Sequence, residues 1–305
     1  MFQKTLKSKI TFKGIGLHSG VISEITISPA APNTGILFVR VDTNVKNKKI
    51  LANFESVTPA KLCTRISNGS ISVSTIEHLM AALYGTGIDN VLIEINGEEI
   101  PILDGSAKEF TKEINRVGLI NQSSKVNFLK ITNKIICEDN NKFSSIEPIA
   151  GDYLEIDCQI DFHDHFIKKQ SKRISFQNNE FMDIYDSRTF CLKRDLENIF
   201  KMGLGKGGSL DNAVIVSDDR VLNQDGLRYN DEFVRHKILD CLGDLYLSGY
   251  KIIGKVKSHQ GGHELTYKLV KNLMKNKNNW KLIQFENQIF SKKIKNLSSQ
   301  AVVNI

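Results

Sequence analysis

Apolar and polar positions alternate near the start of the chain in the way that half-buried β-strands require. The segment 24–28 has an apolar residue at every second position, and 35–41 is a short, largely apolar run. A further apolar run at 90–95 is typical of a buried strand. We therefore expect the first part of the chain to form a sheet.

Two helices are predicted in the same part of the chain. One extends from about 75 to 84, where Ser74 and Glu77 have the spacing of a capping box and Gly85 follows as the expected stop. The other covers 107–117. The first part therefore combines strands with helices.

The second half repeats this order of strands before helices. We interpret the polar stretch 121–125 as a boundary, which divides the chain into domains 1–122 and 126–305. After it we predict strands at 127–131, 134–138, 153–160 and 251–256, a helix at 231–248, and a loop at 258–263 that leads into another helix. The pattern favours an α+β fold of two similar domains, each a β-sheet packed on α-helices.

Composition narrows the class of protein. The 305 residues are 41% hydrophobic, and the sequence contains no apolar run of about 18 residues, so we expect no transmembrane helix. The basic N-terminus lacks a following apolar stretch, so we expect no signal peptide and a cytoplasmic protein.

The five cysteines are scattered without a CxxC pair, which argues against a disulfide framework and against a paired-thiolate metal site.

The formal net charge of +7 would suit an anionic partner. The lysines of 44–49 and 271–279 stand among asparagines, without interleaved aromatic residues. Such runs are usually solvated surface and give little support to a nucleic-acid-binding face. We therefore expect no nucleic acid among the partners.

The segment 233–244 carries the most informative chemistry. On a helix, His236 and Asp240 are four residues apart and share one face, which Asp244 extends by a turn. An imidazole and a carboxylate on one face supply two of the three protein ligands that a catalytic zinc needs. The alternative is a solvated charged face with i,i+4 pairs, in which Lys237 would be a natural partner.

Two further segments contain candidate site residues. Glu77 and His78 open the first predicted helix, but they lack the second histidine of an HExxH motif, so His78 taken alone is typical of a capped or core histidine. His263 follows two glycines in a loop and has the titration range of a general acid. The glycine-rich loop 203–208 lacks the ending of a phosphate-binding P-loop, and we interpret it as a flexible lid or linker.

Several segments, taken together, carry a family resemblance from about residue 4 to residue 285. They are GIGLHSG at 14–20, STIEHLMAAL at 74–83, GIDN at 87–90, IPILDGSA at 100–107, SRTF at 187–190, DGLR at 225–228, FVRHKILD at 233–240, and GH at 262–263. With this order and spacing the chain resembles the UDP-3-O-acyl-N-acetylglucosamine deacetylases, zinc enzymes of the committed step of lipid A synthesis.

The resemblance implies two similar α+β domains with the active site in the cleft between them. It also implies an inserted element near 190–216 that shapes a passage for the acyl chain. The zinc ligands implied by the matching motifs are His78, His236 and Asp240. Such a set leaves a fourth position for water, as a catalytic zinc requires.

The same resemblance implies roles for the neighbouring residues. Glu77 maps onto the general base, and His263 onto the protonated residue that helps the amine to leave. Asp244 would hold and polarise His263, and the Thr189 hydroxyl would donate to the oxyanion. The positions that map onto substrate contacts are Lys237 for sugar or phosphate, Phe162 and Lys142 for the uridine and diphosphate, and Leu62, Cys63 and Phe190 for the acyl chain.

The chain departs from the family pattern at two places. Phe162 is followed by residues 163–164 that lack the expected His-Pro pair, which puts the nucleotide pocket in doubt. His259 and Gln260 stand where the family more often has other residues, and we interpret His259 as a bystander. The proposed metal and acid–base positions do not depart from the pattern.

The expected reaction is hydrolysis of the N-acetyl group of a UDP-linked, 3-O-acylated glucosamine by a monomeric enzyme. Two alternatives stay open. One is a zinc amidase of the same fold that acts on a different acylated sugar nucleotide. The other is a metal-stabilised binding protein without catalysis, although the chain retains both Glu77 and His263. A His₂Asp site would also accept Fe²⁺ or Co²⁺ in place of Zn²⁺.

Overall fold

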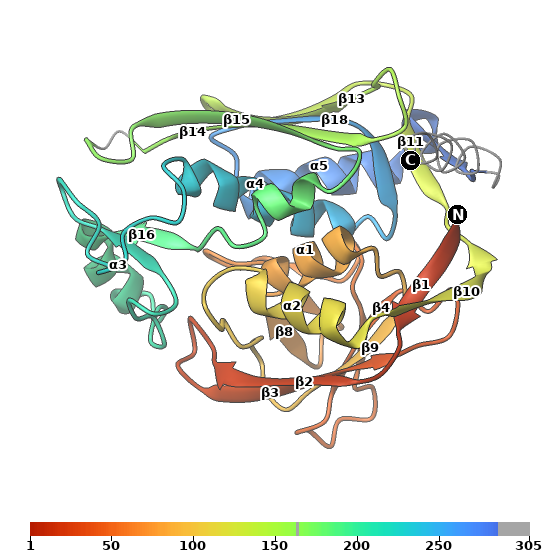
Figure 1. Cartoon of the computed structure of the whole chain (residues 1–305), viewed down its shortest axis with the longest axis horizontal. Coiled ribbons are helices and arrows are strands. Elements are labelled where there is room, and N and C mark those ends of the chain that lie inside the picture. The colour runs from red at the N-terminus through yellow and green to blue at the C-terminus, as the bar shows by residue number, and fades with distance from the viewer. Residues whose placement is uncertain (163–164, 286–305) are drawn as a thin grey trace, which may run out of the picture.

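The computed structural model describes residues 1–162 and 165–285, and in it two β-sheets enclose a double layer of helices (Figure 1). The helices next to one sheet are α1 and α2, and those next to the other are α4 and α5. Their bounds are Glu77–Thr86, Lys108–Val117, Glu232–Tyr246 and His263–Lys275, respectively. The fold is therefore α+β, as the sequence pattern predicts.

The first sheet has five strands in the order β2-β3-β9-β4-β5. Only β4 and β9 are parallel, and the other neighbours are antiparallel. The strands are β2 at Ile10–Ile15, β3 at Ile22–Pro29, β4 at Ile36–Arg40, β5 at Lys49–Leu51 and β9 at Val91–Ile95. Their alternate apolar side chains are buried against the helices, which confirms the predicted half-buried strands.

The second sheet has seven strands arranged around β18 at Lys251–His259. This strand pairs with β11 along 251–253 and with β13 and β14 along 254–259. The others are β11 at Phe128–Ile131, β12 at Ile135–Asp139, β13 at Lys142–Glu147, β14 at Leu154–Asp161, β15 at Lys169–Phe176 and β19 at Trp280–Ile283. Strand β18 leads directly toward the start of α5.

Several smaller elements lie outside the two main sheets. A two-stranded ribbon joins β1 at Phe2–Leu6 to β10 at Leu119–Lys125, and a three-stranded sheet contains β6 at Val57–Thr58, β7 at Arg65–Ser67 and β8 at Ser72–Ser74. Short 3₁₀ turns are η1 at Glu180–Asp183 and η3 at Lys277–Asn279. None of the helices among these described residues has the length and apolar composition needed to span a bilayer.

A further small element lies at 190–216, where the family resemblance implies an insertion. Its strands β16 at Phe190–Leu192 and β17 at Val214–Val216 are parallel, and η2 at Lys193–Asp195 and α3 at Leu196–Lys201 lie between them. The glycine-rich turn that follows α3 contacts the first half of the chain, because Gly207 N–H donates to the Leu17 carbonyl at 3.0 Å. Figure 1 shows this element at one margin of the molecule.

Helices α1 and α4 pack backbone to backbone at the centre of the molecule. A Cβ atom added at Gly243 of α4 would lie 2.1 Å from the carbonyl oxygen of Glu77, which is shorter than a van der Waals contact allows. Only glycine therefore permits this approach without displacement. The packing brings the N-terminal turn of α1 against the C-terminal half of α4.

The ends of α1 differ from the prediction. The helix has Ile76 as its N-cap, without a side-chain capping bond, so the proposed capping box of Ser74 and Glu77 does not form. The cause is the backbone of Thr75, whose φ of 57° turns the chain before the helix. The helix also continues past Gly85, and Gly87, with φ of 84°, caps it instead.

Two polar segments lie in regular elements. The stretch 121–125, which we interpret as a domain boundary, is the end of β10, whose alternating polar side chains suit an exposed ribbon. His263 is not in a loop but is the first residue of α5, with Gly262 as its N-cap. The first sheet lies entirely within 10–95 and the second within 128–283. The exact division at 122 and 126 stays a prediction.

Candidate active site

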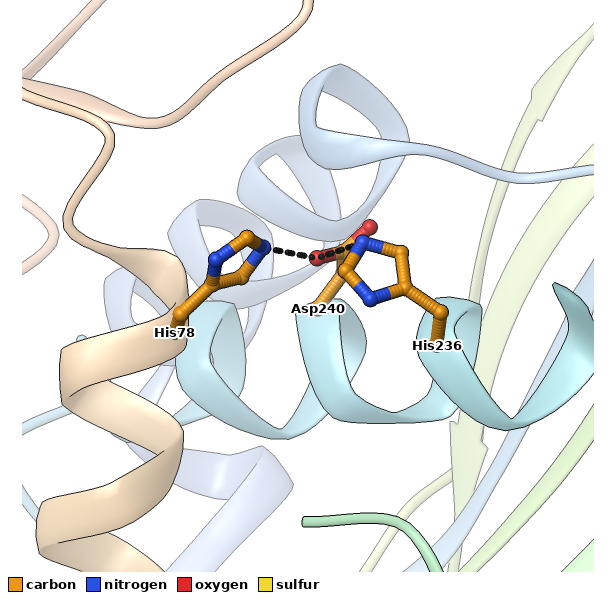
Figure 2. Close-up of side chains that lie close together, drawn as sticks. All are labelled: His78, His236 and Asp240. Atoms are coloured by element: carbon orange, nitrogen blue, oxygen red, sulfur yellow. Dashed lines mark ion pairs between the residues drawn. The ribbon is translucent and has the colours of Figure 1, made fainter. Parts of the chain in front are cut away.

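Three buried side chains from α1 and α4 form a compact group of potential metal ligands. His78 is the second residue of α1, and His236 and Asp240 lie one turn apart on α4 (Figure 2). Their ligand atoms all lie within 4.8 Å of one another. Asp240 Oδ1 is 3.4 Å from His78 Nε2 and 3.3 Å from His236 Nε2. The close packing of α1 on α4 is what brings His78 to this position.

The chemistry of this group fits a divalent cation. Asp240 Oδ1 is buried and has no hydrogen-bond partner among the residues that the structure describes. A buried carboxylate oxygen without a partner is costly, and a cation is one way to satisfy it. Two imidazoles and one carboxylate are a known donor set for a catalytic zinc.

The ring of His236 is oriented for metal binding by the backbone. Its Nδ1 is 3.0 Å from the Ser187 carbonyl, which can only accept, so Nδ1 carries the proton. The lone pair of Nε2 is therefore directed toward Asp240. Burial lowers the pKa of His236 to about 4, which keeps the imidazole neutral. A neutral ring is the form that binds a metal.

Lys237 interacts with the second oxygen of the same carboxylate. Its Nζ donates to Asp240 Oδ2 at 2.7 Å. Burial acts to raise the pKa of Asp240, but His236 and Lys237 outweigh it, so the pKa lies well below its usual range. Asp240 is thus ionised with one oxygen bound by lysine and the other facing both histidines. The contact between Lys237 and substrate stays a prediction.

Glu77 lies beside this group at the start of α1. Its side chain is buried, and Oε2 accepts a hydrogen bond of 3.0 Å from the backbone N–H of Thr64. Burial raises the pKa of the Glu77 carboxyl, although His263 and His78 act in the opposite direction. A carboxyl with a raised pKa is suited to accept a proton near neutral pH.

His263 faces Glu77 from the N-terminus of α5. Its Nε2 is 3.8 Å from Glu77 Oε1, and its Nδ1 is 2.7 Å from Asp244 Oδ2. Burial acts to lower the pKa of His263, but Asp244 outweighs this effect, so the pKa rises to about 9. The imidazole is therefore protonated at neutral pH. The arrangement places a proton acceptor and a proton donor 3.8 Å apart.

Thr64 is a member of this site that the sequence reasoning missed. It is buried, and its Oγ1 donates to Asp244 Oδ1 at 2.5 Å and lies 3.1 Å from His263 Nδ1. Its backbone N–H also binds Glu77. The only signal in the sequence was its position next to Cys63, which the family resemblance had assigned to the acyl side.

His18 is a second buried residue with unused polar atoms. Neither of its ring nitrogens has a hydrogen-bond partner among the described residues. Burial lowers its pKa, and it is close enough to His263 and His78 for their charges to act on it. Its backbone N–H donates to Glu99, which fixes the segment that carries it. Its place in the motif at 14–20 was the signal available in the sequence.

The first half of the chain also holds Thr189 in place. The backbone N–H of Thr189 donates to the Gly105 carbonyl at 2.8 Å. Gly105 has φ of 83°, and an added Cβ would lie 2.1 Å from the Asn212 carbonyl oxygen. Arg228 Nη1 pairs with Asp104 Oδ2 at 2.8 Å beside this contact. The segment 187–189 therefore contributes both the Ser187 carbonyl that orients His236 and the half-buried Thr189.

The residues assigned to substrate contacts fall into two groups. Phe190 lies edge-on to His236, with ring centroids 6.1 Å apart, and Phe162 packs edge-on against Phe190 at 5.2 Å. The exposed Leu62 and the buried Cys63 directly precede Thr64. These four lie next to the site or to residues of it. Lys142, by contrast, is the exposed first residue of β13 and pairs across a hairpin with Asp139. The departure at 163–164 lies outside the described residues.

Comparisons with known proteins agree with this geometry. The family described as UDP-3-O-acyl N-acetylglycosamine deacetylase matches residues 3–275. The chain is 42% identical over 288 residues to the UDP-3-O-acyl-N-acetylglucosamine deacetylase of Chromohalobacter salexigens, which covers 93% of this chain and 94% of that protein. Proteins of the same name from Histophilus somni and Citrifermentans bemidjiense are 41% and 42% identical, covering 94% and 95% of both partners. The chain belongs to the UDP-3-O-acyl N-acetylglycosamine deacetylase family.

Proposed function

We propose that this protein is a zinc-dependent deacetylase that hydrolyses the N-acetyl group of UDP-3-O-acyl-N-acetylglucosamine. The products are acetate and the free amine of the UDP-linked, acylated sugar, in the committed step of lipid A biosynthesis. The observation that carries the proposal is the buried group of His78, His236 and Asp240 with Glu77 and His263 beside it, in a chain of this family.

The metal of the proposed site is Zn²⁺, held by His78, His236 and Asp240. The unpaired Asp240 Oδ1 and the Nε2 lone pair of His236 support this ligand set. When bound, zinc supplies Lewis acidity and lowers the pKa of a coordinated water toward about 7. Every other contribution to the reaction comes from the side chains around the site.

Glu77 serves as the general base in this proposal. It removes a proton from the attacking water, whose oxygen adds to the carbonyl carbon of the acetamide. Its raised pKa makes it a better proton acceptor than an exposed carboxylate. The bond from the Thr64 N–H to Oε2 leaves Oε1 directed toward His263 and the reaction space.

His263 serves as the general acid. As the carbon–nitrogen bond breaks, it gives its proton to the departing amine nitrogen. This leaves the neutral amine and acetic acid, which loses its remaining proton to water as acetate. Asp244 keeps His263 protonated before this step and fixes the orientation of the ring. The Thr189 hydroxyl donates to the oxyanion that develops on the carbonyl oxygen, a role for which its position next to the Ser187 segment is suited.

The substrate contacts are proposed on the same basis. Phe190 and Phe162 extend from His236 toward the surface, and Leu62 and Cys63 directly precede Thr64, which supports a path for the acyl chain and uridine. The exposed side chains of Phe200 and Met202 on the inserted element add apolar surface for an acyl chain. Lys237 and Lys142 are the proposed contacts to sugar or diphosphate.

The proposal is tested with purified zinc-loaded protein and a panel of UDP-sugars. We expect release of acetate from UDP-3-O-acyl-N-acetylglucosamine and little release from the analogue without the 3-O-acyl chain. We also propose that the protein acts as a cytoplasmic monomer, which fractionation and light scattering would test. Acetate release only from another acylated sugar nucleotide would identify the alternative amidase, and binding without release would identify a non-catalytic protein.

A further inference from the structure

We infer that Thr64 is a positioning residue that holds the proposed base and the proposed acid in one frame, an inference that rests on the proposed function. Thr64 is 5% exposed and is the residue that contacts Glu77, Asp244 and His263 together. These three residues belong to three different helices. A side chain at this junction can set the distance between base and acid.

The backbone of Thr64 is bound to the start of α1 on both sides. Its N–H donates to Glu77 Oε2 at 3.0 Å, and its carbonyl accepts from Ile76 N–H at 3.4 Å. The segment between β6 and β7 is thereby docked onto the first turn of the helix that carries Glu77. Thr64 is therefore held against α1, and its hydroxyl contacts residues of α4 and α5.

The direction of each hydrogen bond follows from the proton count. An ionised Asp244 can only accept, so the single hydroxyl proton of Thr64 is donated to Oδ1 at 2.5 Å. The Thr64 oxygen is then left as an acceptor, 3.1 Å from His263 Nδ1. That nitrogen donates to Asp244 Oδ2 at 2.7 Å and shares its proton with Thr64.

This ring of hydrogen bonds selects one nitrogen of His263 for chemistry. Because Nδ1 is engaged by both Asp244 and Thr64, the proton available for transfer is the one on Nε2. That nitrogen is 3.8 Å from Glu77 Oε1 and 3.9 Å from Asp240 Oδ2, so it faces the reaction space. Without the hydroxyl, Asp244 loses a donor and the ring of His263 loses one of its two restraints. The acid would then be misoriented relative to the base, while the ligands of the proposed metal site stay in place.

The test compares variants that separate the hydroxyl from the shape of the side chain. Thr64→Val preserves the branched shape and the backbone N–H to Glu77 but removes the hydroxyl, and Thr64→Ser preserves the hydroxyl. Thr64→Ala is a second hydroxyl-free variant in case valine does not fold. Thr111→Val is the matched control, because Thr111 is also buried and its hydroxyl donates only to the Ala107 carbonyl in α2.

We expect Thr64→Val and Thr64→Ala to lower kcat by roughly 10- to 100-fold, a part of the general acid–base contribution, with KM within about twofold of wild type. Thr64→Ser should recover kcat to within about threefold, and Thr111→Val should leave it unchanged. Rates are expressed per bound zinc, and the NMR signal of the His263 Nδ1 proton should change in Thr64→Val and be restored in Thr64→Ser.

Two results would overturn the inference. One is wild-type kcat per zinc in a folded Thr64→Val or Thr64→Ala protein. The other is a Thr64→Ser protein as slow as the hydroxyl-free variants, since the side-chain shape would then be responsible. Absence of deacetylase activity in the wild-type protein would instead count against the proposed function, so the two failures are distinguishable.

Discussion

His263 Nδ1 lies 2.7 Å from Asp244 Oδ2, with the two residues on different helices, Asp244 buried and the His263 side chain 18% exposed. This pair, rather than burial, determines the charge of the imidazole, because Asp244 raises the pKa to about 9 against the opposing effect of desolvation. The proton that the proposed mechanism delivers to the amine is thus already in place at neutral pH.

The pH dependence of turnover follows from this pair. A raised pKa means that the protonated acid is present below about pH 9 and is lost as pH rises through that value. We therefore expect kcat to fall on the alkaline side near pH 9. In Asp244→Asn the alkaline fall in kcat should move to lower pH, because the attraction that raises the pKa of His263 is removed. A pH–rate profile with the same alkaline limb in both proteins would contradict this assignment.

Glu77→Gln should remove the base without removing the metal site. The amide preserves the size of the side chain but cannot accept the proton of water, so we expect kcat to fall by roughly 100- to 10,000-fold. Zinc content, measured by elemental analysis, should stay close to one per chain. Near-wild-type turnover in this variant would show that another group accepts the proton.

Asp240 and Asp244 lie one turn apart on α4, and replacing each of them should affect zinc content differently. Asp240 faces both histidines, whereas Asp244 binds His263 and Thr64. We expect Asp240→Asn to weaken zinc binding by roughly 100-fold or more and Asp244→Asn to retain zinc. Competition with a chromophoric chelator measures both affinities. Equal loss of zinc in the two variants would be inconsistent with the proposed ligand set.

Gly105→Ala should disturb the site from a distance. The added Cβ would lie 2.1 Å from the Asn212 carbonyl oxygen and displace the backbone that binds Thr189. We expect kcat to fall at least about tenfold and stability to fall by about 1–3 kcal/mol. Gly87→Ala is the control, since Gly87 has a similar φ of 84° but open space around it. It should lose stability, measured by thermal unfolding, while retaining kcat.

The helical part of the site could be predicted from sequence because its geometry is local. The i,i+4 spacing of His236 and Asp240 places both on one face of α4 whatever surrounds the helix. The spacing alone could not decide between a metal site and a solvated charged stripe. His78 was identified as a ligand only through the family resemblance. Its position near His236 and Asp240 depends on the packing of α1 against Gly243 of α4, and such packing leaves no local pattern in the sequence.

Long-range contacts and unusual backbone conformations explain what was missed or wrong. Thr64 meets Asp244 across 180 positions of sequence, and no periodicity encodes such a pair. The predicted capping box failed because Thr75 adopts a left-handed conformation that a helix-start pattern does not anticipate. The strand at 121–125 was not predicted because an exposed two-stranded ribbon buries few of its side chains and so leaves little apolar alternation.

We propose a zinc-dependent deacetylase whose metal is held by His78, His236 and Asp240. The most direct measurement is acetate release from UDP-3-O-acyl-N-acetylglucosamine by chelator-treated protein during titration with Zn²⁺. We predict that activity is absent without metal, rises to a maximum at one zinc per chain, and does not recover in His78→Ala at that stoichiometry. Equal acetate release by the metal-free and zinc-loaded proteins, or none by either, would contradict the account.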